Sequence, residues 1–232
     1  MITGAPGVGK SVLFDHLRGA APKIGYVPKG RSEGVEKQTI VGHGHRLAYH
    51  VVPGQASAPR LKALDDLFAG KDIIEGVIHV VAGGHAHVRG DTASAFAQQS
   101  GVSTLAQWLD IQKQAELEDL AETLRWVEQS HRMHQGNPKW FLVAVAKYDL
   151  YYDKRDEAAG FYQTDPGSAF VQKMNATLNR LGAQNFRWDT LPVSSYLDRY
   201  TSPVGNVQPQ LTEPERDHLL TQMINEIEKR CE

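Results

Sequence analysis

One octapeptide near the amino terminus, residues 4–11, constrains this chain more than any other feature. It reads Gly-Ala-Pro-Gly-Val-Gly-Lys-Ser and matches the G-x-x-x-x-G-K-[ST] phosphate loop. Its glycines let the backbone curve around a phosphate with the N–H groups pointing inward, at the start of a helix whose dipole favours negative charge. Apolar residues at helical spacing follow the loop and stop at Gly19. The sequence therefore predicts a nucleoside triphosphate site.

The motif assigns roles to single residues. We expect Lys10 to bridge the terminal phosphates and Ser11 to offer its hydroxyl to a Mg²⁺ ion, which prefers hard oxygen ligands. The loop backbone would surround the phosphates at Gly4, Gly7, Val8 and Gly9. A glycine-rich turn without a ligand is the alternative interpretation.

Composition limits the class of protein. The chain has 232 residues, 41% of them hydrophobic, which is enough for the core of one domain. Its 25 basic and 27 acidic residues nearly cancel, so no broad field favours nucleic acid or an anionic membrane. Cys231 is the only cysteine, which excludes an internal disulfide and fits a reducing compartment. No apolar run is long enough to span a membrane.

Only Met1, Ile2 and Thr3 precede the phosphate loop, so we expect no signal peptide ahead of it. We therefore expect a cytoplasmic protein without membrane insertion. A phosphate loop normally follows a buried strand of about five residues. The short segment predicts either an abbreviated first strand or a start downstream of the true one.

The following segments predict alternating strands and helices. Residues 32–41 and 46–55 have the alternation of two strands around a glycine-rich turn, which predicts a hairpin. The apolar runs 73–82 and 140–146 have the pattern of strands buried on both faces. Further segments complete the pattern: a helix at 60–68, a strand at 185–190, and a last helix that a Thr212–Glu215 capping box opens.

Two further motifs follow predicted strands: Val51-Val52-Pro53-Gly54-Gln55 ends the hairpin, and Lys147-Tyr148-Asp149 follows the strand at 140–146. With these motifs the chain resembles the Ras-like small GTPases of the translation-factor-related class, most closely the Arf and Rab branches. The resemblance covers nearly the whole chain. It implies one α/β domain over residues 1–232: a doubly wound, mostly parallel sheet with one antiparallel edge strand, helices on both faces, and nucleotide at the carboxyl ends of the strands.

The resemblance implies roles around the terminal phosphate. The family ends the hairpin with D-x-x-G-Q, so Gly54 would bind the γ-phosphate through its N–H and Gln55 would orient the attacking water. The catalytic residues would then be Gln55 and the phosphate-bridging Lys10. Ser32 would offer a second hydroxyl to the metal. The family's metal-associated aspartate is Val51 here, so hydrolysis should suffer more than binding. A solvated loop glutamine is the alternative for Gln55.

The resemblance also implies a guanine site. In the family's N/T-K-x-D motif, Asp149 would accept hydrogen bonds from the guanine ring and the Lys147 stem would lie across the base. Adenine lacks those donors, and an unpaired buried carboxylate would disfavour it. Ala146 replaces the family's Asn or Thr, so a bond to the phosphate loop is lost. A short loop after the strand at 185–190 would contact the guanine oxygen through Ser194 or Ser195.

The segment 83–137, between the predicted strands at 73–82 and 140–146, is longer than the single helix that this fold needs to connect them. We expect a long loop at 83–103, then a helix from Leu105 to Met133 that Gly136-Asn137-Pro138 stops. A protein partner or a neighbouring domain could bind the 104–134 helix or the segments that respond to nucleotide. The alternative for the helix is that it is a long core helix with no partner.

The remaining polar features suggest solvated loops. His85, His87, His131 and His134 lack the spacing of a zinc site and are expected to be solvated. Residues 151–156 are expected to form a solvated loop whose tyrosines could flank the base.

The sequence thus predicts a GTP- or GDP-binding switch that hydrolyses GTP slowly with Mg²⁺. A pseudo-GTPase used as a nucleotide-gated interaction module is the main alternative, because of Val51 and Ala146. A P-loop ATPase or kinase is the third.

Overall fold

The computed structural model describes residues 1–21, 26, 35–42, 45–52, 58–68, 70, 73–88 and 91–231. Within them, six strands form one sheet in the order β2-β3-β1-β4-β5-β6. The strands are β1 (Ile2–Thr3), β2 (Glu36–Gly42), β3 (His45–Val51), β4 (Gly76–Val81), β5 (Trp140–Val145) and β6 (Arg187–Pro192). All neighbours pair in parallel except β2 and β3, so the predicted hairpin supplies the antiparallel edge strand.

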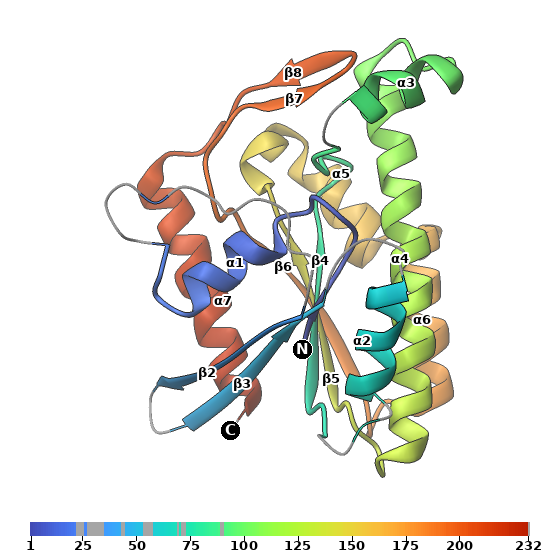
Figure 1. Cartoon of the computed structure of the whole chain (residues 1–232), viewed down its shortest axis with the longest axis vertical. Helices are drawn as coiled ribbons and strands as arrows, with labels where there is room; N and C mark the ends of the chain where they lie inside the picture. The colour runs from blue at the N-terminus through green and yellow to red at the C-terminus, as the bar shows by residue number, and fades with distance from the viewer. Residues whose placement is uncertain are drawn as a thin grey trace.

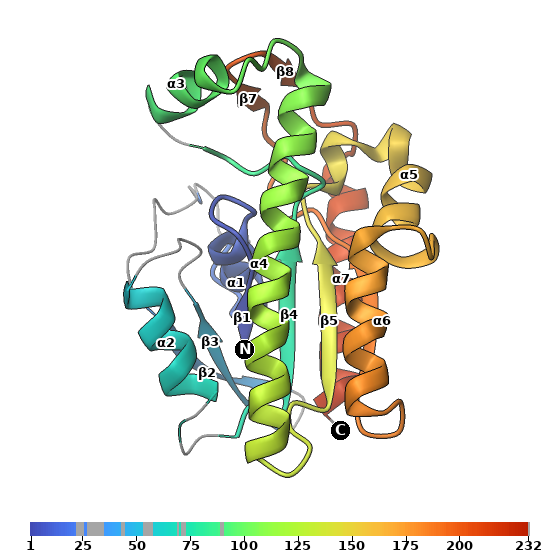
Figure 2. The same ribbon diagram turned by 90° about the vertical axis from the view of Figure 1, so that its right-hand side faces the viewer.

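Helices cover both faces of this sheet (Figure 1). α1 (Lys10–Leu17) and α7 (Glu213–Cys231) pack on one face through Leu13, Phe14, Met223 and their neighbours. α2 (Ala58–Phe68), α4 (Leu105–Met133) and α6 (Ala169–Leu181) pack on the other face, as Figure 2 also shows. Every residue of β4 and β5 is buried, because both faces of these central strands are covered. The fold is therefore the doubly wound α/β fold that the sequence predicts.

The segment before the long helix differs from the prediction. Residues 83–103 were expected to form a loop, and instead contain helix α3 (Asp91–Gln99). Alanine is abundant here and has the highest helix propensity, and Ala93 and Ala97 bury one face of the helix. Thr104 then caps α4, accepting a hydrogen bond from the Gln107 backbone N–H at 3.3 Å. The limits of α4 agree with the prediction.

The segment after β5 also differs. The predicted loop at 151–156 lies within a series of short helical turns: η1 (Tyr148–Leu150), η2 (Tyr152–Lys154), α5 (Arg155–Ala159) and one π-helical turn, η3 (Gly160–Thr164). Tyr151 is buried, and its hydroxyl donates to the carbonyl oxygen of Ala146 at 2.7 Å. The prediction was wrong for Tyr151, because a tyrosine can bury its ring while its hydroxyl finds a partner, whereas residues 152–156 are exposed as predicted.

A short hairpin, β7 (Tyr200–Ser202) and β8 (Gly205–Val207), lies beside the upper end of α4 and α3 (Figures 1 and 2). Its register is antiparallel, with Tyr200 opposite Val207. This end of the molecule is the one to which the carboxyl ends of β4 and β5 point. The hairpin therefore lies at the same end of the sheet as the phosphate loop, which follows the carboxyl end of β1.

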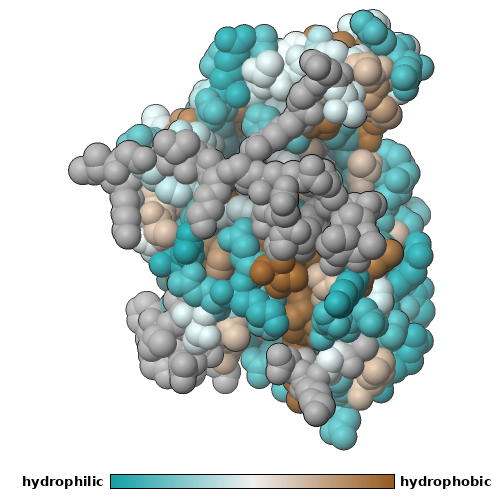
Figure 3. All heavy atoms as spheres, in the orientation of Figure 1, coloured by the Kyte–Doolittle hydropathy of each residue, from teal (hydrophilic) through white to brown (hydrophobic). Residues whose placement is uncertain are grey.

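Hydrophilic residues cover most of the described surface on the face in Figure 3, and hydrophobic ones show in small separate areas, one of them near the centre. Among the helices of the described residues, none combines the length and apolarity needed to cross a bilayer.

Candidate nucleotide-binding site

The phosphate loop joins the end of β1 to the start of α1, where a doubly wound sheet binds ligands. Gly4 and Gly7 have φ angles of 136° and 74°, which side chains rarely tolerate. A Cβ atom would lie 2.2 Å from the carbonyl oxygen of Val80 at Gly4, and 2.2 Å from that of His87 at Gly7. The loop therefore needs both glycines for its turn and for its close contact with neighbouring backbone.

Lys10 is held inside this loop. Its Nζ atom donates hydrogen bonds of 2.7 Å to the carbonyl oxygens of Gly4 and Ala5. The residue is 8% exposed, and burial lowers its pKa to about 7, although Asp119 raises it. A phosphate group beside Nζ would favour the charged ammonium. Lys10 therefore lies in the phosphate loop, where an anionic ligand would stabilise its charged form.

Lys147 connects the second motif to the phosphate loop. Its Nζ atom donates to the carbonyl oxygens of Gly7, at 3.0 Å, and His85, at 2.5 Å. Its backbone is left-handed, with φ at 54°, a conformation that surrounding contacts must maintain. Burial lowers the pKa of Lys147 to about 7, while Glu116 and Asp149 raise it. The Lys147 side chain thus ties the phosphate loop to the segment after β4.

Asp149 follows in η1 and is 1% exposed. One carboxylate oxygen, Oδ1, accepts a short hydrogen bond from the Ser194 hydroxyl, and Oδ2 is buried without a hydrogen-bond partner among the described residues. Burial raises the pKa of Asp149, and the Ser194 bond lowers it. A buried acceptor without a partner is costly, so Oδ2 fits a site that a donor fills on binding.

Ser194 and Ser195 lie directly beyond β6, as predicted, and both are buried. Within the described residues, the Ser195 hydroxyl also lacks a hydrogen-bond partner, while its carbonyl oxygen contacts His16 Nε2 at 2.6 Å. The predicted base-reading residues Lys147, Asp149, Ser194 and Ser195 therefore come together.

The residues predicted to lie around the metal and the terminal phosphate are described only in part. Ser32, Gly54 and Gln55 lie outside the described residues. Ser11 lies in the first turn of α1, and its hydroxyl donates to Glu36 Oε1 at 3.4 Å. Val51 is 1% exposed and packs in the apolar core beside α1.

Sequence reasoning did not find the role of Glu116 in α4. Its Oε1 atom accepts hydrogen bonds from the N–H groups of Ala82, at 2.9 Å, and Gly84, at 3.2 Å. Its Oε2 atom accepts the Tyr162 hydroxyl at 2.6 Å. Glu116 thereby fixes the segment after β4, where His85 provides the carbonyl that Lys147 contacts. A glutamate within the apolar stripe of a helix was the available signal.

Tyr200 was also missed. It is 1% exposed, its hydroxyl accepts the Trp108 indole N–H at 2.8 Å, and its ring centroid lies 5.7 Å from Lys147 Nζ. Its ring also packs edge-on against His85, with centroids 5.1 Å apart. Tyr200 thereby connects the β7–β8 hairpin and α4 to the candidate site.

A charged cluster of Arg60, Asp119, Glu122 and His79 lies beneath the phosphate loop. Arg60 of α2 contacts Asp119 at 2.6 Å, Glu122 at 3.1 Å and the Gly4 carbonyl at 3.5 Å. Burial raises the pKa of Asp119 to about 6 and lowers that of His79 to about 3. Arg60 therefore links α2 and α4 to the loop.

The predicted solvated histidines differ from one another. His87 is exposed, whereas His85 is 3% exposed and stacks on Tyr151 with centroids 5.2 Å apart, so the prediction was wrong for His85. Burial lowers the pKa of His85 to about 4. His131 and His134 are half-buried rather than solvated. In the described part of the chain, no three His, Cys, Asp or Glu residues group as metal ligands.

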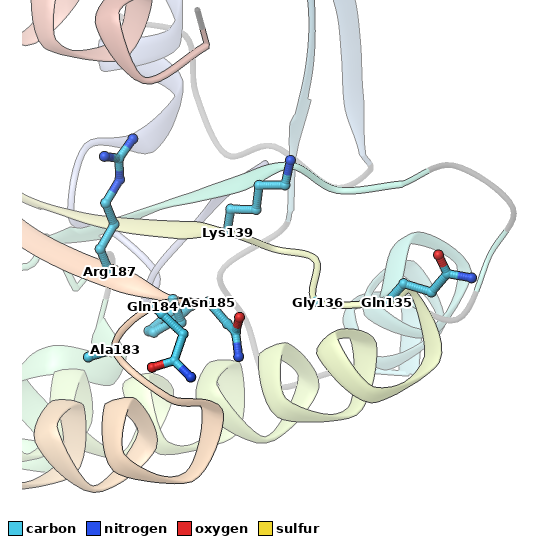
Figure 4. A pocket seen from close by; sticks show the side chains of 8 residues that line it. Gln135, Gly136, Lys139, Ala183, Gln184, Asn185 and Arg187 are labelled. Carbon is cyan, nitrogen blue, oxygen red and sulfur yellow. The ribbon is translucent and has the colours of Figure 1, made fainter.

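A cavity of about 340 Å³ lies elsewhere, at the amino ends of β5 and β6 (Figure 4). It is lined by Gln135, Gly136, Lys139, Ala183, Gln184, Asn185, Phe186 and Arg187. The side chains of Lys139 and Arg187 extend away from those of Gln184 and Asn185, so these polar groups do not converge. The cavity is separate from the phosphate loop, which lies at the opposite ends of the strands.

No protein-family model matches this sequence, and no curated protein matches it. Among solved structures, the chain is similar to a dimerization-deficient mutant of Toc33 from Arabidopsis thaliana. The identity is 11% and the TM-score 0.42, over 96% of this chain and 79% of that one. Similarity at this level assigns no function, which depends on the site residues described above.

Proposed function

We propose that this chain binds GTP and GDP with Mg²⁺ and acts as a molecular switch that hydrolyses GTP slowly. The observation that carries the proposal is the meeting of three motifs at one sheet edge. The phosphate loop follows β1, Lys147 and Asp149 follow β5, and Ser194 follows β6, and hydrogen bonds join them. A nucleotide has phosphate and base at opposite ends, and the motifs offer partners for both.

The phosphate end would depend on Lys10. In the ligand-free loop, Lys10 Nζ contacts the carbonyl oxygens of Gly4 and Ala5. Phosphate oxygens are stronger partners for the ammonium than neutral carbonyl oxygens, because they carry negative charge. The N–H groups of the loop, from Gly7 to Ser11, would surround the same phosphates.

The base end would depend on Asp149. Its unpartnered Oδ2 atom is an acceptor, and guanine presents its ring N1–H and 2-amino donors side by side, a pair that adenine lacks. Burying adenine against that carboxylate would cost about 1–3 kcal/mol. This supports guanine over adenine and weighs against a P-loop ATPase or kinase.

The metal side supports slow hydrolysis. When bound, Mg²⁺ would neutralise charge on the β- and γ-phosphate oxygens. The donors near Ser11 are hard oxygen atoms and fit this ion, with Ser32 as a further proposed ligand. Val51 offers no oxygen at the position where the family has its aspartate. Gln55 is proposed to orient water, with Gly54 at the γ-phosphate.

The switch would act through α2 and α4. Arg60 joins α2 to Asp119 of α4 and to the carbonyl of Gly4 in the phosphate loop. A nucleotide-dependent movement of α2 would therefore change contacts along α4, which we propose as a surface for a protein partner or neighbouring domain. The buried, apolar surroundings of Val51 also favour a second candidate, a pseudo-GTPase that binds nucleotide without turning it over.

Fluorescent GTP, GDP and ATP analogues, titrated with and without Mg²⁺, test the proposal, with phosphate release followed in the same samples. We expect Lys10-dependent binding of guanine nucleotides and slow release of phosphate. Guanine binding without release would favour the pseudo-GTPase. A preference for ATP, or no binding at all, would contradict the proposed function.

A further inference from the structure

The proposed metal side lacks a carboxylate where the family has one. Val51, at the end of β3, is 1% exposed and packs with Ile2, Leu13 and Phe14 in the core beside α1. An aspartate at this position would place its carboxylate on the α1 side of the sheet. The apolar contacts of Val51 therefore leave the Mg²⁺ site without this oxygen ligand.

The neighbouring strand supplies a carboxylate at the same level. Glu36 of β2 pairs directly with Val51 of β3 in the antiparallel register. Directly opposed residues extend their side chains on the same face, with Cβ atoms about 5 Å apart. Gln38, two residues further along β2, contacts Arg18 of α1 at 3.3 Å, as expected if this face of β2 is turned toward α1.

Glu36 also contacts the proposed metal ligand. The Ser11 hydroxyl donates to Glu36 Oε1 at 3.4 Å. Lys10, one residue earlier, directs its ammonium group to the carbonyl oxygens of Gly4 and Ala5 instead. Among the described residues, the carboxylate of Glu36 is thus engaged by the serine hydroxyl and not neutralised by the loop lysine.

From these contacts we propose that Glu36 replaces the missing aspartate as the metal-associated carboxylate. This rests on the proposed function and adds a residue to its Mg²⁺ site. Glutamate is one methylene longer than aspartate, and the extra length suits a carboxylate that reaches from the next strand. Ser11 and Glu36 together offer the hydroxyl and carboxylate oxygens that Mg²⁺ prefers, either directly or through a retained water.

The rate at which a fluorescent GDP analogue dissociates, measured across a Mg²⁺ titration, tests this role. In Glu36→Gln we expect the Mg²⁺ concentration that half-maximally slows release to rise about 10- to 100-fold, as for other groups that support a metal. Release in EDTA should keep its wild-type rate, because phosphate and base contacts are unchanged. Gln38→Ala, on the same face of β2, is the matched control and should behave as wild type.

Mn²⁺ binding to the GDP complex, followed by electron paramagnetic resonance, gives a direct second measurement. We expect a similar weakening of Mn²⁺ binding in Glu36→Gln and retention of part of the affinity in Glu36→Asp. If Glu36→Gln keeps wild-type Mg²⁺ and Mn²⁺ dependence while the protein still binds GDP, the role of Glu36 is wrong and the proposed function stands. If the wild type binds no guanine nucleotide, the proposed function fails, and the role of Glu36 with it.

Discussion

The base side and the metal side of the candidate site are built differently. On the base side, Lys147 donates to Gly7 and His85, Ser194 donates to Asp149, and Glu116 fixes the segment after β4. On the metal side, Val51 is apolar and one contact of 3.4 Å joins Ser11 to Glu36. Under the proposed function, the groups that would hold a nucleotide are present, while a carboxylate that would serve hydrolysis is missing at Val51. The proposal therefore separates binding from turnover within one site.

The largest expected effect is at the phosphate loop. Lys10→Ala removes the ammonium that donates to the carbonyl oxygens of Gly4 and Ala5, and we expect nucleotide affinity to fall by about 2–5 kcal/mol, or roughly 30- to 5,000-fold. Equilibrium titration with labelled GDP would measure it. Lys139→Ala, beside the cavity at the other end of β5, is the control. Equal losses in both variants would contradict a specific role for Lys10.

Asp149→Asn tests the base side. The variant keeps a partner for Ser194 but replaces the charged acceptor, and we expect GDP to lose about 1–3 kcal/mol of binding free energy relative to ADP. Competition between GDP and ADP for one labelled nucleotide measures the difference. Ser168→Ala, in a buried cap of α6 remote from the motifs, should leave the GDP to ADP ratio unchanged. An unchanged ratio in Asp149→Asn would show that Asp149 does not read the base.

The pH dependence of binding gives a smaller effect. Burial lowers the pKa values of Lys10 and Lys147 to about 7, and bound phosphate should raise that of Lys10. Binding should therefore take up protons above pH 7, and affinity should fall several-fold from pH 7 to pH 8. Titration calorimetry in buffers of different ionisation enthalpy measures the uptake. Proton release on binding would contradict the assignment.

The same two lysines affect stability in the opposite direction. The unfolded chain keeps their protons up to pH 10.5, whereas the folded, ligand-free protein loses them near pH 7. The unfolded state therefore binds more protons between these values, and the lysines' contribution makes the free energy of unfolding rise with pH. Denaturant titrations without nucleotide at pH 7 and pH 9 would detect this rise.

The smallest effect should come from the hairpin. Tyr200→Phe removes the acceptor of the Trp108 indole N–H but keeps the ring near Lys147. We expect the free energy of unfolding to fall by about 1 kcal/mol and GDP affinity to stay within about threefold. Thermal and denaturant unfolding measure the first quantity, and a large loss of affinity would assign the hairpin to the nucleotide site itself.

Local patterns were enough to predict much of this molecule. The phosphate loop, the hairpin, the two buried strands and the limits of α4 follow from glycine spacing, apolar runs and helical periodicity, which neighbouring residues determine. The positions of Lys147, Asp149 and Ser194 followed because parallel strands bring their carboxyl ends to one edge. The single-domain assignment for residues 1–232 stays a prediction.

The errors came from contacts between distant segments. Tyr151 and His85 look polar in sequence, but they stack on each other and bury their rings. The role proposed for Glu36 was not predicted, because it depends on the register of β2 against β3, which places Glu36 opposite Val51. The sequence alone pairs Glu36 with Val51 only if the number of residues in the turn between the two strands is known.

The most direct test of the central claim is a crystal structure of the protein with GDP and Mg²⁺. We expect the guanine ring to donate to Asp149 Oδ2, and Lys10 Nζ to leave the carbonyl oxygens of Gly4 and Ala5 for the phosphates. A nucleotide bound elsewhere, for example in the cavity beside Lys139 and Arg187, with Asp149 Oδ2 still without a partner, would contradict the account.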